Sequence, residues 1–404
     1  MPRCVALAIQ QSQWLSHRNL ISTPMRILVN ALSARLGGGQ TYLLNLLRHA
    51  PKETGWHIFV LAQPSLSLDG LPENVERVES PSLENPLLRA IWERFRLGAL
   101  TRQLAVDVLF SPGGLLPNGL PGDVTTAVTF QNMLPFDHAQ RKKYPYGYRR
   151  VRDWLLERGL SSAMRRAGLV IFISEYARDF IERRIGPLRG QKVVIPHGIE
   201  EIFRHSSKNI LHRPAWLPKT DYFLYVSFID HYKAQLEIVR GFDIYKRQGG
   251  KEKLLLVGPE YRPYGDSVRR EIANRGLTGE VILAGNVLHS ELPAIYQHAK
   301  INIFASFTEN CPNILLEMMA SGRPALVSNL APMTEFGGNT VAYFDPANPE
   351  DFAQRLAELV ADQARQDWLA SAAMERVADY SWERAARLTW MALASAGRKD
   401  GAAR

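Results

Sequence analysis

Two glutamates, Glu309 and Glu317, stand eight positions apart in a segment that predicts the start of a helix. The apolar run 301–306 just before them is typical of a buried parallel strand. Pro312 suits the first turn of a helix, where its missing N–H group costs nothing. We therefore expect Glu309 in the loop after the strand and Glu317 on the helix, one turn after its start.

The start of this helix is suited to an anion. N–H groups near Asn313 and Ile314 would point out of the carboxyl edge of the sheet and favour a phosphate. One carboxylate would face a reacting sugar and the other a more distant diol, which predicts a donor site for a nucleotide sugar. Solvated helix ends are the alternative explanation for two acids at this spacing. The segment 318–328 favours the donor site, because a helix ends there at Gly322 and a strand starts after Pro324.

The composition limits the class of protein. A chain of 404 residues favours two domains, and 46% hydrophobic with 22% charged residues is typical of a globular protein. No apolar run is long enough to span a bilayer. The net charge of +9 indicates an anionic partner: a nucleotide, a nucleic acid or a membrane surface. The two cysteines, Cys4 and Cys311, give neither a disulfide framework nor a metal pattern, which suits a reducing cytoplasm.

Short apolar strands alternate with longer amphipathic segments along most of the chain. The predicted strands are 26–30, 57–61, 106–111, 126–130, 169–174, 192–196, 223–228, 253–257, 281–284, 301–305, 325–328 and 341–344. The predicted helices include 41–49, 176–184, 235–247, 266–274, 291–297, 313–320, 350–360 and 363–378. This alternation predicts an α/β protein with two Rossmann-like, doubly wound domains that face a central cleft.

The same pattern divides the chain. Residues 1–24 are interpreted as a leader or a mis-called start, because their short apolar run is interrupted by glutamines. Residues 25–204 are expected to form the first domain and residues 205–380 the second, joined by a polar, proline-containing linker. Residues 381–404 are expected to form a terminal helix that packs back on the first domain, and a tail.

Two further features are suited to phosphate. Glycines 37–39 follow the first strand and let the backbone approach a phosphate, although a tight turn is the plainer explanation. Lys233 follows the first strand of the second half and can neutralise a diphosphate, although a lysine taken alone is more often a solvated surface residue. The chain has no dinucleotide fingerprint, no P-loop and no zinc-ligand pattern. It has no Asp-x-Asp pair, which argues against a metal-dependent glycosyltransferase, so no metal or other cofactor is expected.

Together these features resemble the retaining GT-B glycosyltransferases of family 4, the glycosyl transferases group 1. The resemblance covers roughly residues 25–390. Its most specific part is 306–327, where the family's E-x7-E segment is followed by A-x-G-x-P. Secondary matches are the segments 37–40, 173–175, 195–200 and 344–346, with Lys233 and Glu335.

The resemblance implies a role for each matching residue. The implied donor-binding residues are Gly37, Gly38, Lys233, Asn313, Ile314 and Glu317, of which Lys233 would hold the diphosphate and Glu317 the ribose hydroxyls. Glu309 is the implied catalytic residue, which would orient the transferred sugar and stabilise its charge and need not be a covalent nucleophile. In this family the leaving phosphate is thought to deprotonate the acceptor on the same face. The implied function is transfer of a sugar from a nucleotide-diphospho-sugar to a glycan or lipid-linked acceptor, in cell-surface polysaccharide assembly.

The chain departs from the family pattern at several positions. Ser227 and Phe228 stand where many members have Gly-Arg, so the diphosphate would lose one charged contact. Ala234 replaces the glycine after the lysine, and His197 replaces an asparagine at what we interpret as a structural turn. The family's acceptor-side histidine is also missing. Its candidate replacements are Gln131, Asn132 and His138.

The segment 141–154 interleaves tyrosine and tryptophan with lysine and arginine. This composition suits an anionic membrane interface, a nucleic acid, or a solvated helix face with a few buried rings. The GT-B resemblance favours a membrane or lipid-linked acceptor and no nucleic acid, with Arg149, Arg150, Arg152 and Trp154 as contacts. The expected location is cytoplasmic, peripheral on the inner face of the cell membrane. Alternatives for the whole chain are another GT-B enzyme, such as a nucleotide-sugar epimerase or a phosphorylase, and a non-catalytic partner subunit.

Overall fold

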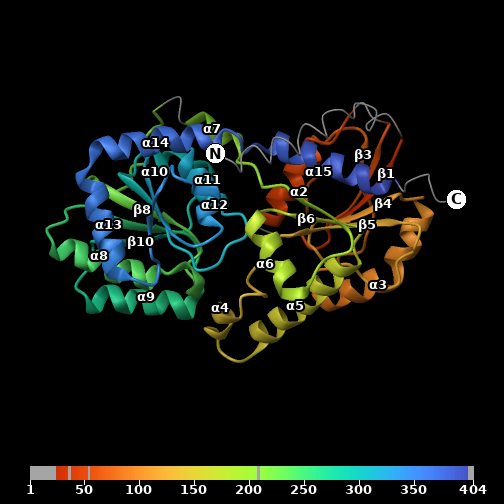
Figure 1. The fold of residues 1–404 in the computed structure, drawn as a ribbon, viewed down its shortest axis with the longest axis horizontal. Coiled ribbons are helices and arrows are strands. Elements are labelled where there is room, and N and C mark those ends of the chain that lie inside the picture. Colours follow the sequence, from red (N-terminus) through yellow and green to blue (C-terminus); the bar gives the residue numbers. More distant parts are fainter. Residues whose placement is uncertain (1–23, 35–37, 53–54, 207–209, 399–404) are drawn as a thin grey trace.

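The computed structural model describes residues 24–34, 38–52, 55–206 and 210–398. Gly37 and nearly all of the predicted leader lie outside these ranges. The described chain forms two lobes, each a parallel sheet covered by helices on both faces (Figure 1). The prediction of two Rossmann-like α/β domains is confirmed.

The first domain contains a seven-stranded parallel sheet with the order β3-β2-β1-β4-β5-β6-β7. Its strands are β1 (Arg26–Asn30), β2 (His57–Leu61), β3 (Val75–Val78), β4 (Val108–Ser111), β5 (Thr125–Phe130), β6 (Leu169–Phe172) and β7 (Gln191–Val194). Its helices are α2 (Gly38–Arg48), α3 (Pro86–Gln103), α4 (His138–Lys142), α5 (Tyr148–Arg166) and α6 (Glu175–Ile185). All strands run in one direction, so their carboxyl ends meet at one edge.

The second domain contains a six-stranded parallel sheet with the order β10-β9-β8-β11-β12-β13. Its strands are β8 (Tyr222–Val226), β9 (Lys253–Val257), β10 (Val281–Gly285), β11 (Ile301–Phe304), β12 (Ala325–Ser328) and β13 (Ala342–Phe344). Short α7 (Glu201–Ser206) precedes them. The other helices are α8 (Gln235–Arg247), α9 (Arg262–Asn274), α10 (Leu292–Gln297), α11 (Asn313–Met319), α12 (Met333–Gly337), α13 (Pro349–Ala361) and α14 (Gln363–Val377), with one-turn helices at His231–Lys233 and His289–Glu291.

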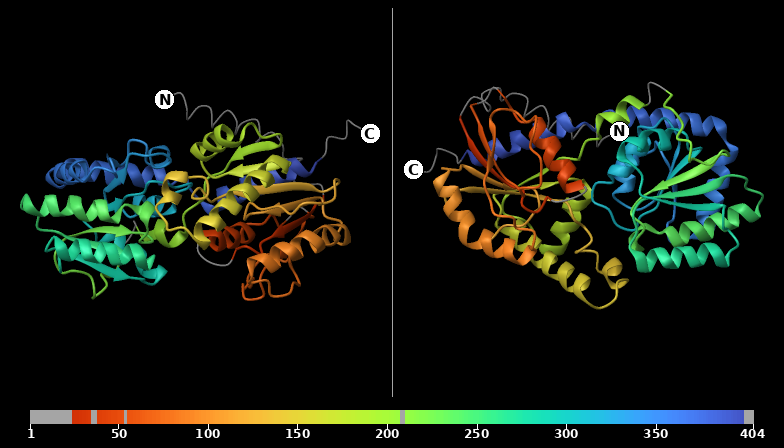
Figure 2. Two further views of the ribbon diagram at one scale, coloured as in Figure 1. Left: turned by 90° about the horizontal axis from the view of Figure 1, so that it is seen from below. Right: turned by 180° about the vertical axis from the view of Figure 1, so that it is seen from behind.

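Alternation along the strands decides which helices cover each face of the first sheet. On β1, Ile27 and Val29 pack with α2, whereas Leu28 packs in the cluster on the opposite face. Helices α3, α5 and α6 cover that opposite face, and α3 and α5 lie along the same side of the domain in both views (Figure 1, Figure 2). Period-2 burial therefore places α5, which carries the second half of the basic segment 141–154, on a different face from α2.

Helix α15 (Trp382–Gly397) follows the second domain but packs on the first (Figure 1). The indole N–H of Trp390 donates to the carbonyl of Leu46 at 3.1 Å. The returning chain passes very close to Gly198, where a Cβ would lie 2.1 Å from the Trp382 nitrogen. Only glycine fits at this crossing, which gives the turn at His197-Gly198 a structural reason.

Helix α3 ends with an alanine in a glycine-type position. Ala105 has φ 48°, and the N–H groups of Ala105 and Val106 donate to the carbonyls of Arg102 and Thr101 at 3.1 and 3.0 Å. This is the Schellman pattern, in which glycine usually occupies the left-handed position.

Candidate active site

The carboxyl ends of β8 and β11 bring Lys233 and Glu309 together. Lys233 lies in the one-turn helix after β8, and Glu309 lies in the loop after β11, as the sequence predicted. The Lys233 ammonium forms an ion pair with Glu309 Oε1, and the two side chains are only 7% and 15% exposed. Residues 76 positions apart therefore form one buried ion pair at the edge of the sheet.

The turn that carries Lys233 is fixed on several sides. The Tyr225 hydroxyl donates to the Lys233 carbonyl at 2.6 Å, and Asp230 accepts from the His231 N–H at 2.7 Å. The Phe307 N–H donates to the Tyr232 carbonyl at 2.8 Å, which ties this turn to the loop of Glu309. Ala234 follows with φ 52°, so the departure from the family's glycine places an alanine in a left-handed conformation.

Glu317 lies on α11 in a different environment from Glu309. Its carboxylate is within 3.3 Å of the Tyr296 hydroxyl. Burial raises the pKa of Glu317 to about 8, the hydrogen bond from Tyr296 opposes this, and the charge of Glu200 adds to it. The two acids therefore differ: one is paired with a cation, and the other is held in its neutral form up to mildly alkaline pH.

The structure corrects one expectation about the start of α11. The Asn313 N–H donates to the Cys311 carbonyl at 2.9 Å and is not free for an anion. The Asn313 side chain lies 3.2 Å from His197 Nδ1, and burial lowers the pKa of His197 to about 4. Ile314, half-buried on the same turn, remains a backbone candidate.

Gly38 is the first residue of α2 in the first domain. A Cβ at Gly38 or Gly39 would meet nothing within 4 Å, so the backbone there is open to an approaching group. Gly37 lies outside the described residues.

Asn310, next to Glu309, links the loop of Glu309 to the first domain. Its amide donates to the Phe130 carbonyl at 2.9 Å, and its Oδ1 lies 3.3 Å from the Ser174 hydroxyl. Phe130 is the last residue of β5, so Gln131 and Asn132 leave the first sheet beside the loop of Glu309. Gln131 donates to the Pro112 carbonyl at 3.1 Å, and Asn132 is exposed.

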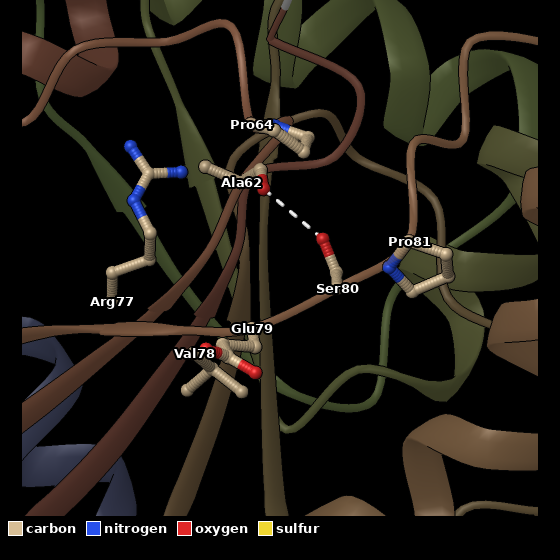
Figure 3. Close-up of a pocket in the computed structure, with 7 residues that line it drawn as sticks. All are labelled: Ala62, Pro64, Arg77, Val78, Glu79, Ser80 and Pro81. Atoms are coloured by element: carbon tan, nitrogen blue, oxygen red, sulfur yellow. Dashed lines mark hydrogen bonds between the residues drawn. The ribbon is translucent and has the colours of Figure 1, made fainter.

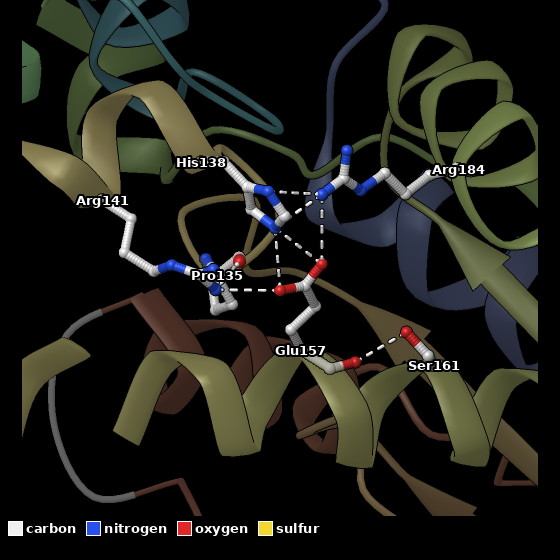
Figure 4. Close-up of polar contacts among 6 residues, drawn as sticks. All are labelled: Pro135, His138, Arg141, Glu157, Ser161 and Arg184. Carbon is white, nitrogen blue, oxygen red and sulfur yellow. Dashed lines mark hydrogen bonds and ion pairs between the residues drawn. The ribbon is translucent and has the colours of Figure 1, made fainter. Parts of the chain in front are cut away.

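His138 belongs to another cluster. Its imidazole lies 2.9 Å from Glu157 and also contacts Arg184, with Arg141 on the far side of the carboxylate (Figure 4). None of the contacts described for His138 involves the Glu309 loop. Gln131 and Asn132 are therefore the acceptor-side candidates that the structure brings to the site.

A buried aspartate joins the two domains near Lys233. Asp230 accepts from the Tyr144 hydroxyl at 2.7 Å and from Arg149 at 2.8 Å, and it is 1% exposed. The Arg149 guanidinium also lies 3.7 Å from the centre of the Tyr144 ring. Burial and the neighbouring Asp230 raise the pKa of Tyr144. Tyr144, Arg149 and Asp230 are called the interdomain clamp below.

The clamp corrects the expected role of Arg149, which faces the second domain instead of a membrane. Arg150 donates to the Tyr144 carbonyl at 2.5 Å, and Arg152 pairs with buried Asp153 at 2.8 Å. Trp154 is 42% exposed and remains on the surface.

A second link between the domains uses Glu335. Its carboxylate accepts from the N–H groups of Glu175 and Tyr176, in the first turn of α6, at 2.8 and 2.9 Å. Burial raises the pKa of Glu335, and these hydrogen bonds oppose the shift. A carboxylate at a helix N-terminus is favourable, so this family match has an interdomain role.

A cavity of about 540 Å³ lies away from Lys233, at the ends of β2 and β3 (Figure 3). The Ser80 hydroxyl donates to the Ala62 carbonyl at 3.2 Å across it. Arg77 donates to the carbonyls of Gln63 and Leu66. The lining is otherwise mostly apolar and lacks the paired charges of the Lys233 site.

Sequence reasoning did not identify Tyr144, Asp230 or Asn310 as functional residues. The sequence did carry a signal for two of them: Asp230 is three residues before Lys233, and Asn310 follows Glu309. Within the ranges that the structure describes, no group of three or more His, Cys, Asp or Glu could hold a metal ion. No described helix is long and apolar enough to cross a membrane.

Two doubly wound parallel-sheet domains, joined here through Asn310, are the architecture of the GT-B class. Solved structures show the same fold. The chain matches a glycosyltransferase from Rickettsia africae with a TM-score of 0.69 and 16% identity, over 93% of this chain and 98% of that one. It matches Anabaena HepE in complex with UDP and glucose with a TM-score of 0.66 and 14% identity, over 92% of this chain and 100% of that one.

Two family models match adjacent parts of the chain. "Glycosyltransferase Family 4" matches residues 36–201, and "Glycosyl transferases group 1" matches residues 207–376. Together they cover most of the sequence, and the chain belongs to the group 1 glycosyltransferases of the GT-B fold.

The curated relatives match a shorter part of the chain than the solved structures do. The O-antigen chain mannosyltransferase B of Escherichia coli is 23% identical over 56% of this chain and 61% of its own length. The GDP-mannose-dependent alpha-(1-6)-phosphatidylinositol monomannoside mannosyltransferase of Mycobacterium tuberculosis is 26% identical over 55% of this chain and 61% of its own length. The chain thus matches about three fifths of the length of these relatives.

Proposed function

We propose that the chain transfers a sugar from a nucleotide-diphospho-sugar to a glycan or lipid-linked acceptor, with retention of configuration. The observation that carries the proposal is the buried Lys233–Glu309 pair, placed where Asn310 joins the loop of Glu309 to the end of β5. A cation and a carboxylate at the ends of two neighbouring strands suit a reaction in which a diphosphate leaves and a sugar becomes positively charged.

The residues of the site would each stabilise a different part of the reacting donor, according to their charge. Lys233 would turn to the diphosphate and neutralise the charge that develops on the leaving group. Glu309, released from the lysine, would face the sugar and stabilise its positive charge. Glu317 would accept hydrogen bonds from the ribose hydroxyls. The backbone at Gly38 and Ile314 would lie close to the phosphates. The leaving phosphate would take the acceptor's proton, so this route needs neither a protein base nor a metal ion.

Gln131 and Asn132 are proposed to hold the acceptor, since they leave the first sheet beside Asn310. The relatives suggest its kind: one is named for an O-antigen chain and the other for a phosphatidylinositol mannoside. We propose an acceptor in cell-surface polysaccharide or glycolipid assembly, on the cytoplasmic face of the membrane.

The first domain carries the surface proposed to meet an anionic membrane. Among the described residues fifteen large apolar side chains are exposed. Four of them lie on α3, and five lie between Tyr146 and Leu155, on two elements of the same side of the domain. Tyr146 is 92% exposed and Phe95 73%. Arginines on both helices accompany these side chains, and rings with cations suit a headgroup layer.

Sedimentation with vesicles tests this surface. The variant Phe95→Ser/Tyr146→Ser should bind anionic vesicles several-fold more weakly than the wild type. Leu288→Ser/Trp368→Ser removes exposed apolar groups from the second domain and serves as the matched control. Equal binding by both variants would remove the membrane argument.

A donor screen tests the activity. The chain is incubated with a panel of GDP- and UDP-sugars, and release of nucleoside diphosphate and thermal shift are recorded. We expect one donor to stabilise the protein and to be hydrolysed slowly, and Glu309→Ala to abolish transfer while the protein still folds. A panel without any binding would contradict the proposal.

A further inference from the structure

A cavity of about 710 Å³ lies on the first domain between helices α4 and α5. Four arginines line it, Arg141, Arg158, Arg165 and Arg166, against a single carboxylate, Glu157. Four positive groups and one negative group leave a formal charge of +3 on the lining. No donor-site residue takes part in it, so the cavity is a separate feature of the molecule.

One wall is a hydrogen-bonded network centred on the carboxylate (Figure 4). Arg141 donates to Glu157 Oε2 at 2.8 Å and to the Pro135 carbonyl at 2.9 Å. Burial alone would raise the pKa of Glu157, but the hydrogen bonds from Arg141 and His138 outweigh it and hold that pKa below its ordinary value. Arg184 reaches the same carboxylate from α6 at 3.4 Å. A single carboxylate thus orients three basic side chains and cannot neutralise them.

The other walls orient arginines without neutralising them. Arg166 donates to the carbonyls of Leu116, Pro117 and Ser162 at 2.9 to 3.2 Å. Arg165 donates to the Ile185 carbonyl at 2.8 Å. Neutral carbonyls fix the planes of these guanidinium groups but leave their charge unbalanced.

The last wall combines a cation with a ring. The Arg158 guanidinium lies 3.9 Å from the centre of the Trp154 ring, and both residues are exposed to the cavity mouth. A planar cation on an indole holds its N–H groups in one plane, which suits two oxygens of one anion.

We propose that this pocket binds a phosphate-bearing group. A guanidinium group can donate two parallel hydrogen bonds to two oxygens of one phosphate. The excess positive charge of the lining favours an anion that carries more than one negative charge. The volume exceeds that of a phosphate ion, so the ligand is a phosphate ester whose remaining part lies against Trp154. The ester comes either from a soluble metabolite or from a lipid headgroup, since the exposed apolar side chains of α5 adjoin the same tryptophan. The pocket does not depend on the donor chemistry proposed above.

Calorimetry on the full chain with glycerol 1-phosphate, and sedimentation with phosphatidic acid vesicles against phosphatidylcholine vesicles, tests the proposal. We expect Arg158→Gln/Arg165→Gln to weaken binding about tenfold or more. Arg247→Gln/Arg270→Gln, on the second domain, removes the same charge and should bind as the wild type does. Binding should also survive Lys233→Met, which separates the pocket from the donor site.

The two probes distinguish the sources of the phosphate. Binding of glycerol 1-phosphate that the pocket variant loses identifies a soluble ester. Binding of phosphatidic acid vesicles that the pocket variant loses, without binding of glycerol 1-phosphate, identifies a headgroup, and a pocket variant that binds both probes as the wild type does overturns the proposal. Arg158→Gln alone, which removes one charge of the lining and the contact with Trp154, keeps the test usable if the double variant does not fold. Equal loss in the control variant, or no binding of either probe by the wild type, overturns the proposal.

Discussion

Replacing Glu317 with glutamine should stabilise the protein, and by more as the pH rises. Burial raises the pKa of Glu317 from 4.5 to about 8, so between these values the folded state holds a proton that the unfolded state releases. Stability therefore falls as the pH rises through this window, with a slope of about 1.4 kcal/mol per pH unit. The glutamine side chain does not titrate in this range. The stability of the variant should therefore not fall with pH for this reason.

The expected magnitude follows from the slope and the exposure. From pH 5 to pH 8 the full effect is about 4 kcal/mol. Because part of the Glu317 side chain meets solvent, we expect roughly half of it, about 2 kcal/mol. Urea unfolding of both proteins at several pH values, followed by tryptophan fluorescence, measures the difference. A gain that is the same at pH 5 and pH 8 would refute the argument, because only titration of Glu317 makes it depend on pH.

The same pKa links stability to donor binding. A ribose diol donates hydrogen bonds, so it favours the ionised carboxylate and should lower the pKa of Glu317. Donor binding near pH 7 should then release a fraction of a proton, and Glu317→Gln should release less. Calorimetry in two buffers of different ionisation enthalpy measures the released proton.

Three other changes have expected outcomes. Ala105→Gly should stabilise the protein by about 1 kcal/mol, since glycine accepts the left-handed conformation without strain; an unchanged urea midpoint would argue against it. Tyr144→Phe removes a buried hydrogen bond to Asp230 and should cost about 1.5 kcal/mol, and equal stability in the same assay would mean that the clamp contributes nothing. Lys233→Met should weaken binding of the nucleoside diphosphate at least tenfold by calorimetry, whereas Lys246→Met should not; equal affinities would contradict the assigned role.

The sequence predicted the buried strands well, because parallel strands covered on both faces are continuous apolar runs. It missed β3, an edge strand whose Glu76 and Arg77 break such a run. It also missed α3, because Leu87, Ile91 and Phe95 lie on its solvent side, so its apolar residues do not mark a core face.

The site was predictable where a short segment carries it. Glu309, Glu317 and Lys233 follow from local motifs after strands. The contacts that join the domains could not be predicted, because they depend on how two separately folded sheets meet. Tyr144 and Asp230 are 86 positions apart, and no local pattern brings them together. For the same reason composition alone placed Arg149 at a membrane, although the structure gives it a buried partner.

The most direct test of the proposed activity is the rate of sugar transfer by Glu309→Gln, measured with the donor and acceptor that the wild type uses. Glutamine keeps the shape and can still accept from Lys233, so the ion pair is lost without leaving an unfilled space. We predict a transfer rate at least about a hundredfold lower, with nucleotide affinity within a few-fold of the wild type. A variant that transfers sugar at nearly the wild-type rate would contradict the proposal that Glu309 stabilises the reacting sugar.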